Sequence, residues 1–309
     1  SSFLQSCFAA SVGALAEAGI RYPEPRHIER VAAGGGSFGN AGVLMPVATG
    51  KPKKNEDIVG PTEAQPHVLY SGETLFVSLV RGRTLPALIA AARAAGFERL
   101  EILLFIRDPV GHHASLWQQR VKAGGDIHAI DDGARAFSRP QMAARFIAAC
   151  AEHPEVRLTV RNYSVVRRDL RGTVAAWLGL PVETLTPPPV ATVNRSLTRG
   201  EIALQLEINR MLGRNGILSG ALRDELPHVR ADEIRPSLAA QATIWERNEA
   251  AIAEVNARID PGQRYRRDVD ESEPPAADTL PMSVEQLRLI GRVLGGEIAR
   301  LRVMAEGDL

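Results

Sequence analysis

Cysteine, net charge and long apolar runs are all scarce in this sequence. Only two cysteines, Cys7 and Cys150, occur among its 309 residues. Both lie in apolar helical patterns without metal-ligand spacing, which argues against a disulfide scaffold or a zinc site and favours buried free thiols. We therefore expect no metal site and a reducing compartment, the cytoplasm.

Positive and negative charges nearly cancel, with 37 Lys and Arg against 36 Asp and Glu. Such a balance argues against a nucleic-acid partner, so any anion site must be local. No apolar run approaches the roughly 20 residues of a spanning helix, and no signal peptide is visible, so we expect no membrane span. The remaining composition, 45% hydrophobic and 24% charged, is that of a globular protein that folds.

Strand and helix patterns alternate over the first two thirds of the chain. The β-like run PHVLYSGE precedes the helix pattern RTLPALIAAARAAGF, and the apolar strand LEILLFI precedes further helices and the strand EVRLTVRN. This alternation predicts βαβ units with a parallel sheet and a ligand at the carboxyl ends of its strands. We expect an α/β core at 1–215.

Two segments depart from this pattern. Residues 32–66, rich in Gly, Pro and charge, predict a long inserted loop, and residues 216–309 predict a helical C-terminal extension that packs on the core. The last helix packs either on the body of the protein or on a second subunit, so a homodimer is an open alternative. At the other end, Phe3 and its apolar successors predict a core-facing helix that ends at Gly19.

The segment LLFIRDPVGHHASLWQQR carries the most chemistry. A buried strand ends at Arg107, and Ser115 follows eight residues later in the next helix. A guanidinium fork and a hydroxyl near a helix start suit a phosphate. The alternative is that Arg107 pairs with a carboxylate and Ser115 is an ordinary helix residue.

An ordered series of motifs, from SSFLQ through YSGE, LLFIRDP and VRNY to VNRSLT, resembles the bacterial PAPS-dependent sulfotransferases. The resemblance covers about residues 1–211 and implies a three-layer parallel sheet of the P-loop type. It also implies that Arg107 and Ser115 hold the 3'-phosphate of the cofactor, and that Ser1, Ser2 and Phe3 belong to the phosphosulfate loop.

The lysine-containing first half of that loop is not in this sequence. A core helix normally needs the strand on which it packs, so we expect the missing half to lie upstream. The alternative is a relative that has lost catalysis. Without the other motifs of the series, a serine pair before a helix would most often be only an N-cap.

The same resemblance implies four further cofactor contacts and a catalytic base. Tyr163 would lie near the adenine, although it also suits a cap on the core. Asn194, Arg195 and Ser196 would close over the phosphate, or else they start the next helix with Ser196 or Thr198 as its cap.

A base must accept the proton of the sulfuryl acceptor. Glu73 in YSGE is the first candidate, although it equally suits an N-cap or first-turn acid. His112 is a weaker one, followed by His67 and His113. The expected function is transfer of a sulfuryl group from PAPS to a hydroxyl or amine of a carbohydrate, glycolipid or small metabolite. The alternatives are a small-molecule kinase and a non-catalytic relative that binds adenosine 3',5'-bisphosphate (PAP).

Overall fold

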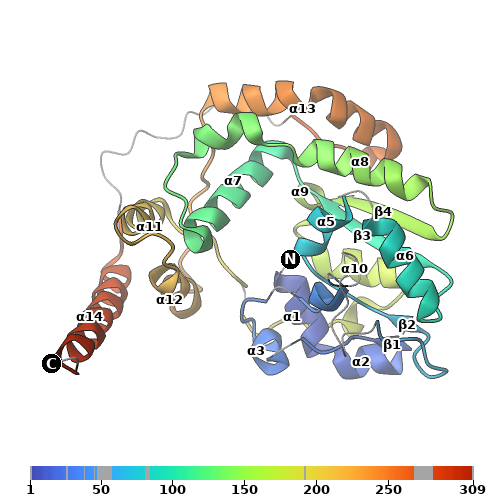
Figure 1. Cartoon of the computed structure of the whole chain (residues 1–309), viewed down its shortest axis with the longest axis horizontal. Coiled ribbons are helices and arrows are strands. Elements are labelled where there is room, and N and C mark those ends of the chain that lie inside the picture. Colours follow the sequence, from blue (N-terminus) through green and yellow to red (C-terminus); the bar gives the residue numbers. More distant parts are fainter. Residues whose placement is uncertain are drawn as a thin grey trace. The chain divides into compact units, whose positions relative to one another are not determined.

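The computed structural model describes residues 2–25, 27–37, 39–44, 46, 58–80, 84–190, 193–267 and 281–307. They form a mostly helical α/β protein with two small parallel sheets (Figure 1). The chain divides into two compact units, and neither is one continuous stretch of sequence. Unit 1 comprises Ser1–Pro109, Ser138–Val193 and Trp245–Asp268, and unit 2 comprises Val110–Phe137, Asn194–Ile244 and Val269–Leu309. The boundary expected at residue 215 therefore falls inside unit 2.

Helices make up most of both units. Those of unit 1 are α1 (Ser2–Ala10), α2 (Val12–Glu17), α3 (Ile28–Ala32), η1 (Ala41–Val43), α5 (Thr74–Leu79), α6 (Thr84–Ala94), α8 (Arg139–Ala151), α9 (Tyr163–Val166), α10 (Leu170–Leu178), η4 (Val182–Thr184) and η5 (Pro261–Gln263). Those of unit 2 are η2 (Arg120–Gly124), η3 (Ile130–Ala136), α11 (Arg199–Leu212), α12 (Ile217–Glu225) and α14 (Val284–Gly307). The unit boundary runs through α7 (Pro109–Gln119) and α13 (Leu238–Arg258).

The strands of unit 1 form two separate parallel pairs. They are β1 (Ile20–Arg21) with β2 (His67–Val68), and β3 (Leu100–Ile106) with β4 (Val156–Asn162). Parallel pairing is as predicted from the sequence. The described residues do not join the pairs into the single three-layer sheet that we expected.

Both faces of β3 are covered, which explains its continuous apolar sequence. Leu104 and Ile106 belong to a hydrophobic cluster with residues of α6 and α8. Leu103 and Phe105, on the other face, pack against a second cluster that contains residues of α1 and α10. The strand is therefore held from both sides up to its carboxyl end.

The first helix differs in detail from its prediction. The chain turns at Ser11, whose hydroxyl accepts the N–H of Thr186 at 2.7 Å, and this turn separates α1 from α2. Gly19 has a φ of 78°, as expected for a left-handed residue at a helix end. Both cysteines are free and buried, and burial raises the pKa of each thiol to about 11.

Unit 2 has an apolar core of its own. Its buried members include Trp117, Val121 and Leu197, with Leu222 from α12 and Leu289 from α14. Among the helices of the described ranges, none has both the length and the apolar character of a bilayer span. Part of the predicted loop at 32–66 lies outside the described residues; its described part begins at the last residue of α3 and contains η1.

Candidate functional site at the strand ends of unit 1

The carboxyl ends of β3 and β4 lie level with each other. Their register pairs Ile106 with Asn162, so Arg107 and Tyr163 follow at the same edge. The Arg107 guanidinium carbon lies 5.3 Å from the centroid of the Tyr163 ring, which is a cation–π contact. The structure thus brings together two of the predicted cofactor-binding residues.

Arg107 is a half-buried cation at the carboxyl end of β3. None of the described acidic side chains forms an ion pair with it. Burial lowers its pKa, the nearby Tyr163 and Asp108 raise it, and Arg167 lowers it again. A guanidinium remains protonated in proteins, so its N–H groups stay available to an anion that reaches the strand ends.

Asn162, fully buried at the end of β4, organises the polar groups of this edge. Its Nδ2 donates to Asp108 Oδ1 at 3.0 Å and to the Arg264 carbonyl at 3.2 Å, and its Oδ1 accepts the Ser164 N–H at 2.9 Å. Its own backbone N–H donates to Gln263 Oε1 at 2.8 Å. The chain after α13 is thereby tied to the strand end. In the sequence, the signal of this role is an asparagine at the end of a strand that alternates apolar with polar residues.

Asp108 is engaged by the same network rather than by Arg107. Its backbone N–H donates to the Ser164 hydroxyl at 3.1 Å, while its carboxylate accepts from Asn162. Ser164 therefore links the two strand ends. The consequence is a rigid frame around Arg107.

Glu73 lies at the end of the segment that connects β2 with α5. Asn40 is buried and donates to the Leu69 carbonyl at 3.0 Å, while its Oδ1 accepts the Ser71 N–H at 2.7 Å. Gly39 has a φ of 82°, and a Cβ there would lie 1.9 Å from the Ser71 carbonyl oxygen, so only glycine fits. Gly39 and Asn40 thus fix the segment that leads to Glu73. Neither residue was predicted from the sequence.

Glu73 itself is exposed at the N-cap position of α5. Its side chain makes no capping hydrogen bond to that helix. The position agrees with the N-cap alternative, and the exposed carboxylate is also accessible to a substrate.

The three residues expected in the phosphosulfate loop stand at the start of α1. Ser1 lies outside the described residues. Ser2 opens the helix and its carbonyl accepts the Ser6 hydroxyl at 3.1 Å, while Phe3 packs against the cluster that includes α10. Gln5 is fully buried on this helix, and neither polar atom of its amide has a hydrogen-bond partner within the described part of the chain.

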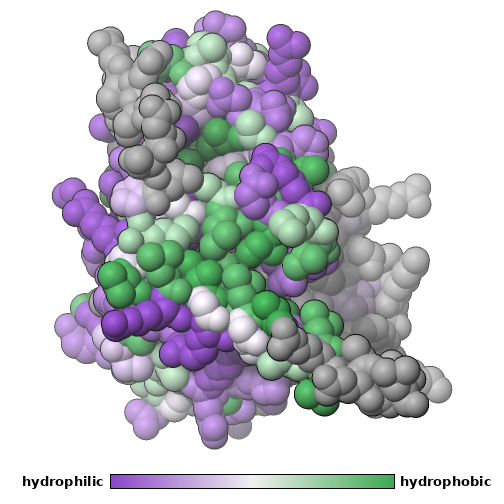
Figure 2. Space-filling model, turned by 90° about the vertical axis from the view of Figure 1, so that its left-hand side faces the viewer, coloured by the Kyte–Doolittle hydropathy of each residue, from purple (hydrophilic) through white to green (hydrophobic). Residues whose placement is uncertain are grey.

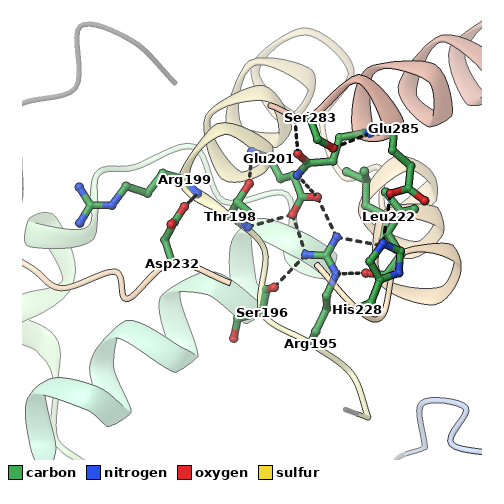
Figure 3. Close-up of polar contacts among 12 residues, drawn as sticks. Arg195, Ser196, Thr198, Arg199, Glu201, Leu222, His228, Asp232, Ser283 and Glu285 are labelled. Atoms are coloured by element: carbon green, nitrogen blue, oxygen red, sulfur yellow. Dashed lines mark hydrogen bonds and ion pairs between the residues drawn. The ribbon is translucent and has the colours of Figure 1, made fainter. Parts of the chain in front are cut away.

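Arg195, in unit 2, has a different environment (Figure 3). It is 3% exposed and forms an ion pair with the fully buried Glu201, through two hydrogen bonds of 2.8 and 2.7 Å. Its other N–H groups donate to the carbonyls of Leu226, Ser196 and Leu222 at 2.7, 3.0 and 2.9 Å. All five guanidinium N–H groups are therefore used inside the protein, and none is left for a phosphate in this arrangement.

Glu201 completes this buried network. Burial by itself raises its pKa, but hydrogen bonds from Arg195, Gln286 and the Thr198 N–H together lower it. Thr198 is the N-cap of α11 and forms a capping box with Glu201. The alternative reading of VNRSLT, the start of a helix capped by Thr198, is thus what the structure contains.

The neighbours of Arg195 have structural contacts as well. Asn194 has a left-handed φ of 54°, and its Oδ1 accepts from the buried Lys122 Nζ at 3.5 Å. The same ammonium donates to the Arg195 carbonyl at 3.3 Å. Ser196 is exposed. The pKa of Lys122 is lowered to about 8, first by burial and then by Arg223 and Arg195.

Three of the remaining predicted residues, His112, His113 and Ser115, lie on α7 in unit 2. His112 is half-buried, with its ring 5.8 Å from that of Phe137. His113 is buried, and its Nε2 lies 2.7 Å from the Ile130 carbonyl; burial lowers its pKa, which the contact with Ile130 partly offsets. Ser115 is half-buried on the same helix. His67 is exposed on β2.

No family model matches the chain, and neither the curated proteins nor the solved structures contain a match.

Proposed function

We propose that this protein is a PAPS-dependent sulfotransferase that acts on a hydroxyl or amine of a carbohydrate, glycolipid or small metabolite. The observation that carries the proposal is Arg107: a half-buried guanidinium at the carboxyl end of a buried parallel strand, unpaired by any described carboxylate. The order of the sequence motifs supports the same family. On this proposal β3 and β4 belong to a three-layer P-loop-type sheet, which is supported by the hydrophobic clusters on both faces of β3.

Arg107 and Tyr163 bind the cofactor in this proposal. The guanidinium donates paired hydrogen bonds to the 3'-phosphate, whose charge also compensates for the burial of the cation. The Tyr163 ring holds the guanidinium plane and lies beside the adenine. The hydrogen bonds of Asn162 to Asp108 and Ser164 keep the two strand ends in place.

Sulfuryl transfer needs in-line geometry and a proton acceptor. The acceptor's oxygen or nitrogen forms a bond to sulfur as the bond from sulfur to the phosphate oxygen of PAPS breaks. The acceptor's proton passes to the Glu73 carboxylate, and PAP leaves with the electron pair of the broken bond. Glu73→Gln is the test of this role: we expect PAP binding to persist and turnover to fall, and unchanged turnover would remove Glu73 from it.

The cofactor site is tested by calorimetry with PAP on the full chain. Arg107→Ala should weaken binding by about 10- to 100-fold, the effect of losing a charge-assisted hydrogen-bonded pair. Arg157→Ala is the matched control, because Arg157 lies at the opposite end of β4 and its side chain is 66% exposed. We expect its affinity for PAP to be unchanged.

Two results would overturn the proposal. One is a folded protein that does not bind PAP, and the other is equal binding by the wild type and Arg107→Ala. Binding of ATP with Mg²⁺ in place of PAP would favour a small-molecule kinase. PAP binding without turnover of PAPS, across a panel of acceptors, would favour the non-catalytic relative.

A further inference from the structure

The last helix, α14, packs into the core of its own unit through residues of its first half. Leu289 and Ile290 are buried and Val293 is half-buried in the core of unit 2. Gln286 is buried as well, and its Nε2 donates to Glu201 Oε1 at 2.8 Å. Beyond Val293, no residue of the described part of α14 belongs to a hydrophobic core cluster.

A different stripe of α14 exposes large apolar side chains. Leu294 is 39% exposed, Ile298 54% and Leu301 56%. Figure 2, viewed from the side of α14, shows a broad hydrophobic area on this surface. Patches of this kind mark interaction sites, because an isolated helix gains nothing from apolar residues in water.

The exposed stripe has the spacing of a coiled coil. Apolar or small residues recur at alternating intervals of three and four positions, which places a leucine at every d position and Val, Gly and Ile at the a positions. They are Val284, Leu287, Gly291, Leu294, Ile298 and Leu301. We call these six residues the α14 seam. A period of 3.5 residues keeps a seam facing a partner helix over its full length, here about 26 Å.

We propose that the α14 seam pairs with the same seam of a second copy of this chain, as a parallel two-stranded coiled coil. Such a seam is self-complementary, and leucine at d with β-branched residues at a favours two parallel strands. Gly291, in the middle of the seam, lets the two helices approach closely.

Charges of both signs flank the seam, with Arg288 at an e position and Glu297 at a g position, and this mixture favours a helical protein partner over an anionic lipid surface. Arg292 forms an ion pair with Glu225, and Arg300 pairs with Glu297 at 2.9 Å. Both arginines are thus neutralised within the chain. None of the six seam residues belongs to the hydrophobic core cluster of unit 2, so pairing leaves the contacts of that core unchanged.

Sedimentation equilibrium of the full chain tests the pairing. The wild type should be a dimer, and Leu294→Lys combined with Leu301→Lys should weaken dimerisation by at least about 100-fold, since two leucines per chain lose their burial. Val303→Lys is the control, because Val303 is 70% exposed but lies off the seam. It should leave the dimer intact. A wild-type monomer, or a dimer that survives the double change, would overturn the proposal.

A cysteine cross-link tests the parallel orientation. Leu287→Cys places a thiol at one end of the seam, where only parallel helices bring the two copies of residue 287 together. Mild oxidation should produce a covalent dimer, and the native cysteines do not interfere because both are buried. A failure to cross-link in a protein that sediments as a dimer would reject the parallel arrangement. If the wild type is monomeric and floats with phosphatidylglycerol vesicles, the seam binds lipid and the dimer proposal is rejected.

Discussion

Arg107 in unit 1 and Arg195 in unit 2 are both predicted to bind the cofactor's phosphate, yet their surroundings differ in the property that decides anion binding. Arg195 forms an ion pair with Glu201, and every N–H group of its guanidinium donates a hydrogen bond inside the protein. Arg107 meets an aromatic ring, and no described carboxylate pairs with it. A buried arginine with a complete set of partners stabilises structure, whereas an arginine whose N–H groups are not all used can donate to an anionic ligand.

The comparison extends to the residues around each arginine. In unit 2, the capping box of α11 supplies Glu201, and α14 supplies Gln286 as a further donor to it. In unit 1, Asn162 donates to one oxygen of the Asp108 carboxylate, and no ion pair between Asp108 and Arg107 is present among the described residues.

Removing Glu201 should produce the largest effect on stability. Glu201→Ala leaves the Arg195 charge buried and unpaired, which costs about 3 to 5 kcal/mol of unfolding free energy. Urea denaturation measures this cost, and hydrogen exchange should show lost protection in α11 and α12. Glu207→Ala is the matched control, since Glu207 forms an exposed pair with Arg210 on the same helix; it should change stability by less than about 0.5 kcal/mol. Equal losses from both variants would contradict the structural role of Arg195.

Lys122, a buried cation beside Arg195, allows a test of the unit 2 network through the pH dependence of stability. Its folded-state pKa of about 8 lies below the ordinary 10.5. Between these values the unfolded chain binds more protons than the folded one, so stability rises with pH over this window. Below pH 8 the full cost of the buried charge is present.

The measurement compares the wild type with Lys122→Met by urea denaturation at pH 7.5 and 10.5. The wild type should gain up to about 3 kcal/mol relative to the variant as the pH rises, and the difference between the two proteins cancels the titration of other groups. The prediction fails if the difference in unfolding free energy between the two proteins is constant over this pH range, or if it shifts in favour of the variant. Either result would show that burial does not lower the pKa of Lys122.

Arg107→Ala should have the smallest effect on stability. It removes a cation–π contact and leaves no buried carboxylate behind, so we expect a change of less than about 1 kcal/mol in the unfolding free energy. Urea denaturation at pH 7.5, alongside Glu201→Ala, gives the direct contrast. A loss as large as that of Glu201→Ala would make Arg107 a structural residue like Arg195 and would weaken the proposed cofactor site.

Several features were predictable because they depend on near neighbours in the sequence. The continuous apolar run at 100–106 is a buried strand in parallel pairing, Gly19 ends a helical segment, and both cysteines are buried and free. The capping box of Thr198 and Glu201 was also readable, as Thr-x-x-Glu before an apolar helix, and it would have indicated that Glu201 lies beside VNRSLT. Helix starts, strand runs and turns are decided within a few residues, so one sequence suffices for them.

The sequence by itself determined the alternation of strands and helices and placed Arg107 at the end of a buried strand. Only the tertiary structure decided which arginine keeps free donors, because that depends on partners from distant segments: Gln286 stands 85 residues beyond Glu201, and Gln263 stands 101 beyond Asn162. The division into two units was equally hidden, since each is assembled from several stretches of chain. Local patterns set which elements form, whereas the free or paired state of a buried charge is set by the atoms that folding brings within hydrogen-bond distance of it.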